Sequence, residues 1–312
     1  MTGLLTIGET LGLVVTGPLR HATTASVGIG GAESNVAIGV RRLGGPATWL
    51  GRVGADPWGE RVLRELRAEG LSVVSVSDPD APTALMTKER RSALATTVLY
   101  HRAGSAGSRL RPADVPPGLV DDAGLVHLTG ITPGLSDTAL ATALHVRDRA
   151  AGAGVPLSFD VNHRAGVWGA RDAASVYRSF AARAAVVFAG EDEARLLTGT
   201  ATTDPEALLD ELAAVCAGDV VLKRGADGCR AIVGGERLAV PAVVVPVVDT
   251  VGAGDAFVAG YLAELLAGRD PATRLATAVR CGAFACLSPG DWEGLPTRAD
   301  LDTLDRPDPV TR

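Results

Sequence analysis

The segment Asp249–Phe257 combines the residue types that phosphoryl transfer needs. It reads Asp-Thr-Val-Gly-Ala-Gly-Asp-Ala-Phe and continues into an apolar run that predicts a helix as far as Leu266. Its two glycines leave adjacent backbone N–H groups unobstructed at the start of that helix, where the helix dipole favours an anion. Asp255 follows in the first turn, where a carboxylate can accept a proton from a hydroxyl group held beside the anion. The plainer alternative is that Asp255 only complements the helix dipole.

A second glycine-rich segment, Gly30–Ala37, precedes another predicted helix. Gly30 and Gly31 permit a ligand to approach the backbone closely, and the amide of Asn35 can both donate to and accept from sugar hydroxyl groups. The alternative is a simple glycine turn with Asn35 in the first turn of the helix. Either interpretation puts these residues at a helix start.

The elements that must position these residues alternate between apolar strand-like runs and alanine- and leucine-rich helical runs, which is typical of an α/β protein. Strands joined by helical crossovers pair in parallel, and ligands then bind at their carboxyl ends. We expect strands at Leu4–Ile7, Thr48–Val53, Leu125–Thr129, Leu157–Asp160, Ala185–Ala189 and Asp219–Lys223, and helices at Ala32–Leu43, Trp58–Glu69, Asp137–Ala151, Ala173–Ala184, Glu191–Leu197 and Pro205–Cys216.

The stretch between residues 73 and 100 departs from this alternation. Val73–Ser77, Ala84–Thr87 and Thr96–Tyr100 are strand-like and have no helical run between them. We interpret them as antiparallel strands that stand apart from the main sheet. Because no linker rich in Pro, Gly or Ser divides the chain, we expect a single domain over residues 1–312 with a small β appendage.

The composition excludes several classes of function. The chain is 46% hydrophobic and carries a net charge of −6, so it can bury a large core and lacks the basic face that binding nucleic acid needs. Its four cysteines show no metal-ligand spacing and are expected to be free thiols of a reducing compartment. The first residues lack the pattern of a signal peptide, and no apolar run reaches the ~20 residues of a membrane span. We therefore expect a cytoplasmic protein with no membrane partner.

Taken together and in this order, Gly30–Ala37 and Asp249–Phe257 resemble the two signatures of the ribokinase-like, PfkB-type carbohydrate kinases. The resemblance covers nearly the whole chain. It implies a three-layer α/β/α fold with a mostly parallel central sheet and a small β-sheet lid, formed by segments around residues 11–29 and 73–102. It also implies a phosphotransferase that uses ATP and Mg²⁺, a homo-oligomer that pairs through the lid, and a catalytic set consisting of Gly252, Ala253, Gly254 and Asp255, with Asp255 as the base.

Within this family the chain looks most like the 2-keto-3-deoxygluconate kinases, which phosphorylate the 6-hydroxyl group of a sugar acid. Three segments carry this resemblance: Tyr100–Ala106, Phe159–Arg164 and Gly290–Pro296. A carboxylate substrate needs a fixed cationic partner, and guanidinium groups provide paired, charge-assisted hydrogen bonds. The substrate-binding residues that the resemblance implies are Gly31, Asn35, Tyr100, Arg102, Arg164 and Asp291.

The nucleotide side is marked by Lys223–Gly228, which follows a predicted strand. The resemblance implies that Lys223, Gly225 and Gly228 border ATP. Asp227-Gly228 is also a good hairpin turn, and both interpretations can hold.

The family's N-x-x-E motif reads Gly190-Glu191-Asp192-Glu193 here, so the glutamate is kept and the asparagine is lost. The resemblance implies that Glu193 contacts the nucleotide's metal through water.

Only two of the 30 basic residues are lysines: Lys223 at the expected ATP side, and Lys88 in the expected lid.

The sequence leaves two alternatives to a sugar-acid kinase open. One is another kinase of the same scaffold, acting on fructose, ribose or a nucleoside. The other is a sugar-acid-binding protein that kept the fold and lost catalysis.

Overall fold

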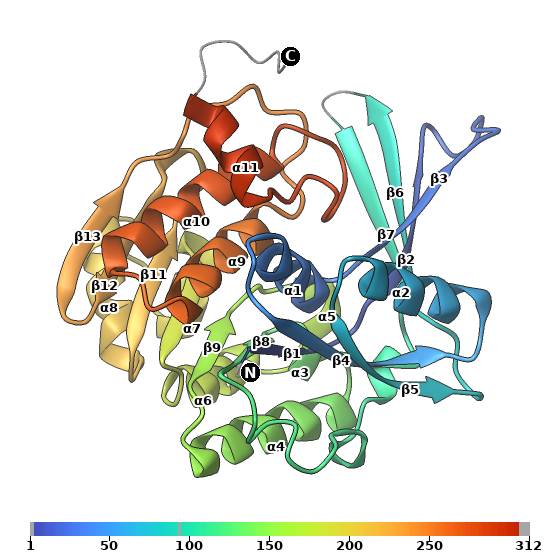
Figure 1. The fold of residues 1–312 in the computed structure, drawn as a ribbon, viewed down its shortest axis with the longest axis horizontal. Helices are drawn as coiled ribbons and strands as arrows, with labels where there is room; N and C mark the ends of the chain where they lie inside the picture. Colours follow the sequence, from blue (N-terminus) through green and yellow to red (C-terminus); the bar gives the residue numbers. More distant parts are fainter. Residues whose placement is uncertain (1–2, 93–94, 306–312) are drawn as a thin grey trace.

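The computed structural model describes residues 3–92 and 95–305, which form a nine-stranded sheet covered by helices and a second, smaller sheet (Figure 1). The strand order of the large sheet is β13-β12-β11-β10-β9-β8-β1-β4-β5, and all pairs from β11 to β5 are parallel. The antiparallel hairpins β11-β12 and β12-β13 close one edge. The strands are β1 Leu4–Ile7, β4 Ala47–Gly54, β5 Ser72–Asp78, β8 Leu125–Thr129, β9 Leu157–Asp160, β10 Val186–Gly190, β11 Asp219–Lys223, β12 Cys229–Val233 and β13 Glu236–Val240.

Helices cover both faces of this sheet, because consecutive residues of a buried strand point to opposite sides. Leu4 belongs to one hydrophobic cluster and Leu5 to the other, and Val186 and Val187 divide in the same way. The first face packs against α1 Ala32–Arg42, α2 Pro57–Ala68, α9 Ala253–Leu266, α10 Pro271–Ala285 and α11 Arg298–Leu301. The opposite layer holds α3 Thr132–Leu135, α4 Asp137–Ala153, α5 Ala165–Trp168, α6 Ala173–Ala181, α7 Glu191–Thr198 and α8 Pro205–Val215. The expected three-layer α/β/α architecture is therefore confirmed.

The small sheet has four strands in the order β3-β2-β6-β7. They are β2 Leu11–Thr16, β3 Ser26–Gly30, β6 Leu85–Ser92 and β7 Ala95–His101. Its own apolar cluster is small and is centred on Leu11, Leu13, Ala84 and Met86. This sheet stands beside the end of the large sheet at which the parallel strands finish (Figure 1).

Two expectations about the strand-only stretch are wrong. Val73–Ser77 does not stand apart, because β5 pairs in parallel with β4 as the edge strand of the large sheet. Helix α2, which precedes β5, supplies the crossover that such a parallel pair needs. The small sheet is also not wholly antiparallel, since β2 and β6 run in parallel.

None of the helices within the described ranges combines the length and apolar character needed to cross a membrane.

Candidate active site

A cavity of about 770 Å³ lies between the carboxyl ends of the parallel strands and the small sheet. Asp160, Gly190 and Lys223 are the last residues of β9, β10 and β11, and all three line it. The small sheet contributes Met86, Lys88 and Tyr100 to the opposite wall, among others. Of the residues singled out by the sequence, the cavity brings together Gly31, Asn35, Tyr100, Arg102, Arg164, Glu193, Lys223, Gly225, Gly252, Gly254, Asp255 and Asp291.

The start of α9 has the backbone geometry expected of an anion cradle. Gly252 caps the helix with a φ of +76°, a left-handed conformation that glycine adopts without strain. A side chain at this position would also collide with the backbone carbonyl of Asp291, so the two loops can approach only because residue 252 is a glycine. Among the described residues, no backbone carbonyl accepts from the N–H groups of Gly254 and Asp255, which leaves both for a ligand. The predicted cradle therefore has the geometry of an anion site.

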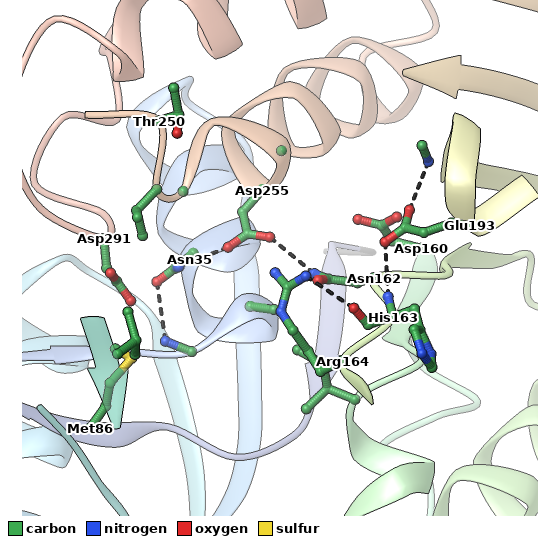
Figure 2. Close-up of a pocket in the computed structure, with 18 of the residues that line it drawn as sticks. Asn35, Met86, Asp160, Asn162, His163, Arg164, Glu193, Thr250, Asp255 and Asp291 are labelled. Carbon is green, nitrogen blue, oxygen red and sulfur yellow. Dashed lines mark hydrogen bonds between the residues drawn. The ribbon is translucent and has the colours of Figure 1, made fainter. Parts of the chain in front are cut away.

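Asp255 lies at the centre of the cavity and is half-buried (Figure 2). Asn35 donates a hydrogen bond of 2.8 Å to one carboxylate oxygen, and Asn162 donates one of 3.3 Å to the other. Loss of hydration raises the pKa of Asp255 to about 7, although the Asn35 hydrogen bond opposes this shift. A carboxylate with this pKa can accept a proton near neutral pH.

Asn162 is a site residue that the sequence reasoning did not single out. Asn162 follows Val161, the first residue after β9. Its φ of +35° lies in the left-handed region that asparagine tolerates better than most residues. This backbone conformation accompanies a side chain that points at Asp255. The signal was present in the Asp-Val-Asn-His-Arg segment, where Asn162, His163 and Arg164 follow closely after a buried strand.

Glu193 ties two strand ends together. Its Oε2 accepts a 2.7 Å hydrogen bond from the backbone N–H of Gly190, and its Oε1 accepts one of 2.8 Å from the N–H of His163. Gly190 caps α7, and the Glu193 carboxylate satisfies its N–H group as in a capping box. The glutamate is thus held rigidly at the edge of the cavity without any contribution from an asparagine at position 190.

Lys223 and Asp160 form an ion pair at the floor of the cavity. The Nζ atom lies 2.7 Å and 2.8 Å from the two oxygens of Asp160, whose side chain is 1% exposed. Burial alone would lower the pKa of Lys223, but the charges of Asp160 and Glu193 outweigh it and raise that pKa. The lysine therefore stays protonated beside the anion cradle. Asp160 was also missed as a site residue, although its place at a strand end was visible in the sequence.

The two candidate carboxylate-binding arginines differ in their surroundings. Arg102 pairs with the buried Glu9 at 2.9 Å and lies over the ring of Tyr100, 4.9 Å from its centroid. Arg164 is exposed and, among the described residues, donates only to the carbonyl of His163, at 3.2 Å. Within the described part of the chain no carboxylate lies within ion-pair distance of it. Figure 2 shows Arg164 beside Asn162 and Asp255. The guanidinium group that has no carboxylate partner in the described residues is therefore the one beside Asp255.

A second cavity, of about 460 Å³, adjoins the first and is largely apolar. Val243, Phe257 and Val279 are among its walls, and Lys223, Gly225, Thr250 and Gly254 line both cavities. Gly228 and Ala253, which do not line the first cavity, line this one. The turn from Arg224 to Gly228 joins the hairpin β11-β12, so the hairpin interpretation holds together with a place beside this cavity.

The chain matches known carbohydrate kinases along most of its length. A model of the pfkB family of carbohydrate kinases matches residues 1–298. The chain is 36% identical to the 2-dehydro-3-deoxygluconokinase of Bacillus subtilis, with 95% of this chain and 93% of that protein covered. It is 35% identical to the 2-dehydro-3-deoxygalactonokinase of Haloferax volcanii, with 92% of each protein covered.

Solved structures show the same similarity. A PfkB protein from Polaromonas sp. JS666 is 34% identical and superposes with a TM-score of 0.87, with 97% of this chain and 99% of that chain covered. A fructokinase from Vibrio cholerae, solved with fructose, ADP and calcium, is 27% identical with a TM-score of 0.85 over 97% of this chain and 99% of that chain. The match along the sequence, the fold and the paired cavities lead to one conclusion: this chain belongs to the pfkB family of carbohydrate kinases.

Proposed function

We propose that this kinase transfers the γ-phosphoryl group of ATP to the 6-hydroxyl group of 2-dehydro-3-deoxygluconate, which is also called 2-keto-3-deoxygluconate. The observation that carries the proposal is the position of Asp255, a carboxylate with a pKa raised to about 7 that lines the polar cavity next to Gly254, a residue that lines both cavities. The sugar-acid substrate is supported by the names of the relatives from Bacillus subtilis and Thermoproteus tenax, the latter 34% identical over 97% of this chain.

In this mechanism Asp255 is the catalytic base. As the 6-hydroxyl oxygen attacks the γ-phosphorus, its proton passes to Asp255, while the bond from phosphorus to the β–γ bridging oxygen breaks and ADP leaves. The amides of Asn35 and Asn162 hold the carboxylate in one orientation, so its free lone pairs face the acceptor. A positioned base of this kind contributes about 10²–10⁴-fold to the rate.

The transferred phosphoryl group lies in the cradle formed by residues 252–255. The N–H groups of Gly254 and Asp255 donate to its oxygens, and the α9 dipole adds a partial positive charge. Lys223 is close enough to contribute its charge, since its Nζ lies 3.9 Å from the point where a Cβ of Gly254 would be. The apolar cavity then holds the base of the nucleotide. Lys223, Gly225 and Gly228 border the nucleotide's phosphates and ribose.

The residues present fit a Mg²⁺ ion that arrives with the nucleotide. No group of three or more His, Cys, Asp or Glu side chains in residues 3–92 and 95–305 is arranged to hold a metal ion. These residues therefore provide no metal site made of protein side chains alone. Mg²⁺ commonly keeps several waters and binds through phosphates and one or two carboxylates. Glu193 would hold such a water. When bound, the ion neutralises charge on the phosphates.

The acid end of the substrate is held by the arginines. Arg102, with Tyr100 beneath it, offers guanidinium N–H groups beyond those that Glu9 occupies. Arg164, without a carboxylate partner in the described residues, contributes the larger uncompensated charge. A neutral hexose would leave this charge unpaired, so the acid is the favoured acceptor. Asp291 and Gly31 complete the acceptor wall.

The direct test is phosphorylation of a panel of acceptors by the purified protein with Mg·ATP. ADP release and ³¹P NMR of the product would be measured for 2-dehydro-3-deoxygluconate, its C4 epimer 2-dehydro-3-deoxygalactonate, fructose, ribose and adenosine. We expect a 6-phosphate from the sugar acids, and a kcat for Asp255→Asn that is lower by about 10²–10⁴-fold with ATP affinity nearly unchanged. Turnover of a neutral sugar alone would favour the fructokinase alternative. Binding of the acid without ADP release would favour a non-catalytic binding protein.

We further propose that the reaction takes place in the cytoplasm and that two copies pair through the small sheet. The four cysteines are free, which suits a reducing compartment. Val27 on β3 and Leu99 on β7 are 48% and 45% exposed and lie in one cross-strand row of the small sheet, and exposed apolar side chains on one sheet face favour association. Light scattering of wild type and Leu99→Glu would test the pairing, with a shift to monomer expected for the variant.

A further inference from the structure

A group of charges centred on the buried Lys88 joins the small sheet to the two loops that form the anion cradle. Lys88 on β6 is 1% exposed, and its Nζ lies 3.3 Å from Oδ2 of Asp249 and 3.5 Å from Oδ1 of Asp291. Arg90, two residues further along the same face of β6, donates a 2.7 Å bond to the same oxygen of Asp249. The loop between α10 and α11, which carries Asp291, runs beside β6 (Figure 1). Three distant segments therefore meet at one ammonium group.

Both carboxylates that Lys88 contacts shape the cradle directly. Oδ1 of Asp249 accepts a 3.1 Å hydrogen bond from the backbone N–H of Val251, which orders the turn before Gly252. The backbone carbonyl of Asp291 lies against Gly252, where only a glycine leaves room for it. A displacement of either aspartate would therefore move the N–H groups that receive the transferred phosphoryl group.

The charges of the group balance only while the small sheet is docked. Lys88 and Arg90 offset the two negative charges of Asp249 and Asp291 across a distance at which burial strengthens Coulomb interactions. Without them, two carboxylates would border a cradle that must accept a phosphate with several negative charges. Such an arrangement would oppose the reaction at the point where it needs positive potential.

We propose that Lys88 is a positioning residue for phosphoryl transfer: by binding Asp249 and Asp291 together it sets residues 249–255 in the phosphate-binding conformation and makes this conformation depend on the docked small sheet. This inference rests on the proposed kinase activity for its kinetic part only. Lys88 acts through the two aspartates, and it links closure over the acceptor to the readiness of the cradle.

The test compares Lys88→Met with Arg91→Met. Methionine keeps the length of the stem and removes the charge, and Arg91 is a matched control because it lies on the same strand, is 60% exposed and pairs only with Glu89 in the described residues. Hydrogen exchange of the peptides covering residues 249–257 gives a readout that needs no activity. We expect exchange at least tenfold faster in Lys88→Met and unchanged in Arg91→Met.

Kinetics with saturating acceptor and ATP give the second readout. For Lys88→Met we expect kcat to fall by about 10²-fold, the size of effect seen when one preorganised electrostatic group is removed, with KM for ATP changed less than about threefold. Methylammonium added to Lys88→Ala should recover at least a tenth of wild-type kcat without restoring the melting temperature. A purely structural tie would instead lower the melting temperature and leave the kcat of the folded fraction unchanged.

Two results would overturn the inference: unchanged exchange over 249–257, or a kcat per folded molecule within threefold of that of Arg91→Met. If Lys88→Met does not accumulate as folded protein, Lys88→Gln carries the same test with the same thresholds. Faster exchange in a protein whose wild type phosphorylates no acceptor would leave the positional role of Lys88 standing and reject the kinase proposal, so the two failures are distinguishable.

Discussion

The side-chain amide of Asn35 donates a 2.8 Å hydrogen bond to the carboxylate of Asp255, across 220 residues of sequence. This contact joins the two glycine-rich segments, because Asn35 lies in the first turn of α1 and Asp255 in the first turn of α9, and the two helices pack side by side. The acceptor side and the phosphate side of the cavity therefore share one carboxylate.

The first prediction concerns pH. Only the deprotonated form of Asp255 accepts a proton, and its pKa is raised to about 7, so kcat/KM should rise as the pH increases through about 7. Asn35→Ala removes a hydrogen bond that lowers this pKa, and the midpoint should then move to higher pH. The pH profile of kcat/KM checks both. Arg64→Ala, at an exposed position on α2, is the control and should keep the wild-type midpoint. A midpoint that moves downward in Asn35→Ala would reject the assignment.

The second prediction concerns the Lys223–Asp160 ion pair. Lys223→Ala leaves Asp160 buried without its partner, and breaking a buried pair in this way costs about 3–5 kcal/mol of unfolding free energy. The double variant Lys223→Met, Asp160→Asn removes both charges and should recover most of this loss. Because Lys223 lines both cavities, its removal should also raise KM for ATP more than KM for the acceptor. Denaturant unfolding and initial rates measure the two effects, and equal stability of the single and double variants would contradict the first.

The third prediction separates the two arginines. Arg102→Met leaves the buried Glu9 without its cation and should lower the unfolding free energy by about 3 kcal/mol, while Arg164→Met should leave it nearly unchanged. Both variants should lower kcat/KM for the sugar acid more than for fructose. The ratio of the two substrates' kcat/KM values, measured for each variant, is the readout. An equal loss on both substrates in Arg164→Met would mean that this arginine does not recognise the carboxylate.

The fourth prediction concerns Gly190. Its φ of −75° suits any residue, and the nearest atom to an added Cβ is an oxygen of Glu193 at 3.5 Å, so Gly190→Asn should fold with unchanged stability. The new amide would add an oxygen ligand beside Glu193, and we expect half-maximal activity at a lower Mg²⁺ concentration. Gly190→Ala separates the effect of the amide from that of losing glycine. Identical Mg²⁺ requirements in the two variants would show that the amide adds nothing.

Much of the fold was predictable from the sequence because its signals are local. Buried parallel strands read as continuous apolar runs, and β8, β9 and β11 have the bounds expected for them. The start of α9 was predictable from the glycines on either side of Ala253, because the backbone freedom of glycine acts within a few residues. The α/β/α architecture then follows from the alternation of these elements.

The misplaced strand β5 shows where local signals end. Its residues are mostly half-buried, as expected of an edge strand, and this pattern is the same whether the edge belongs to a large or a small sheet. The strands β12 and β13 were also not predicted.

The ion-pair partners of Arg102 and Lys223 could not be predicted either. A charge in the sequence does not specify which distant residue will neutralise it.

The sequence by itself determined which residue types this protein has for binding an anion, holding a sugar acid and accepting a proton, and the order in which they occur. Only the tertiary structure decided how those charges are paired: Arg102 with Glu9, Lys223 with Asp160, and Lys88 with Asp249 and Asp291. The physical reason is that propensity and periodicity act over a few residues, whereas the electrostatic energy of a buried charge depends on whichever groups the fold brings within about 4 Å of it.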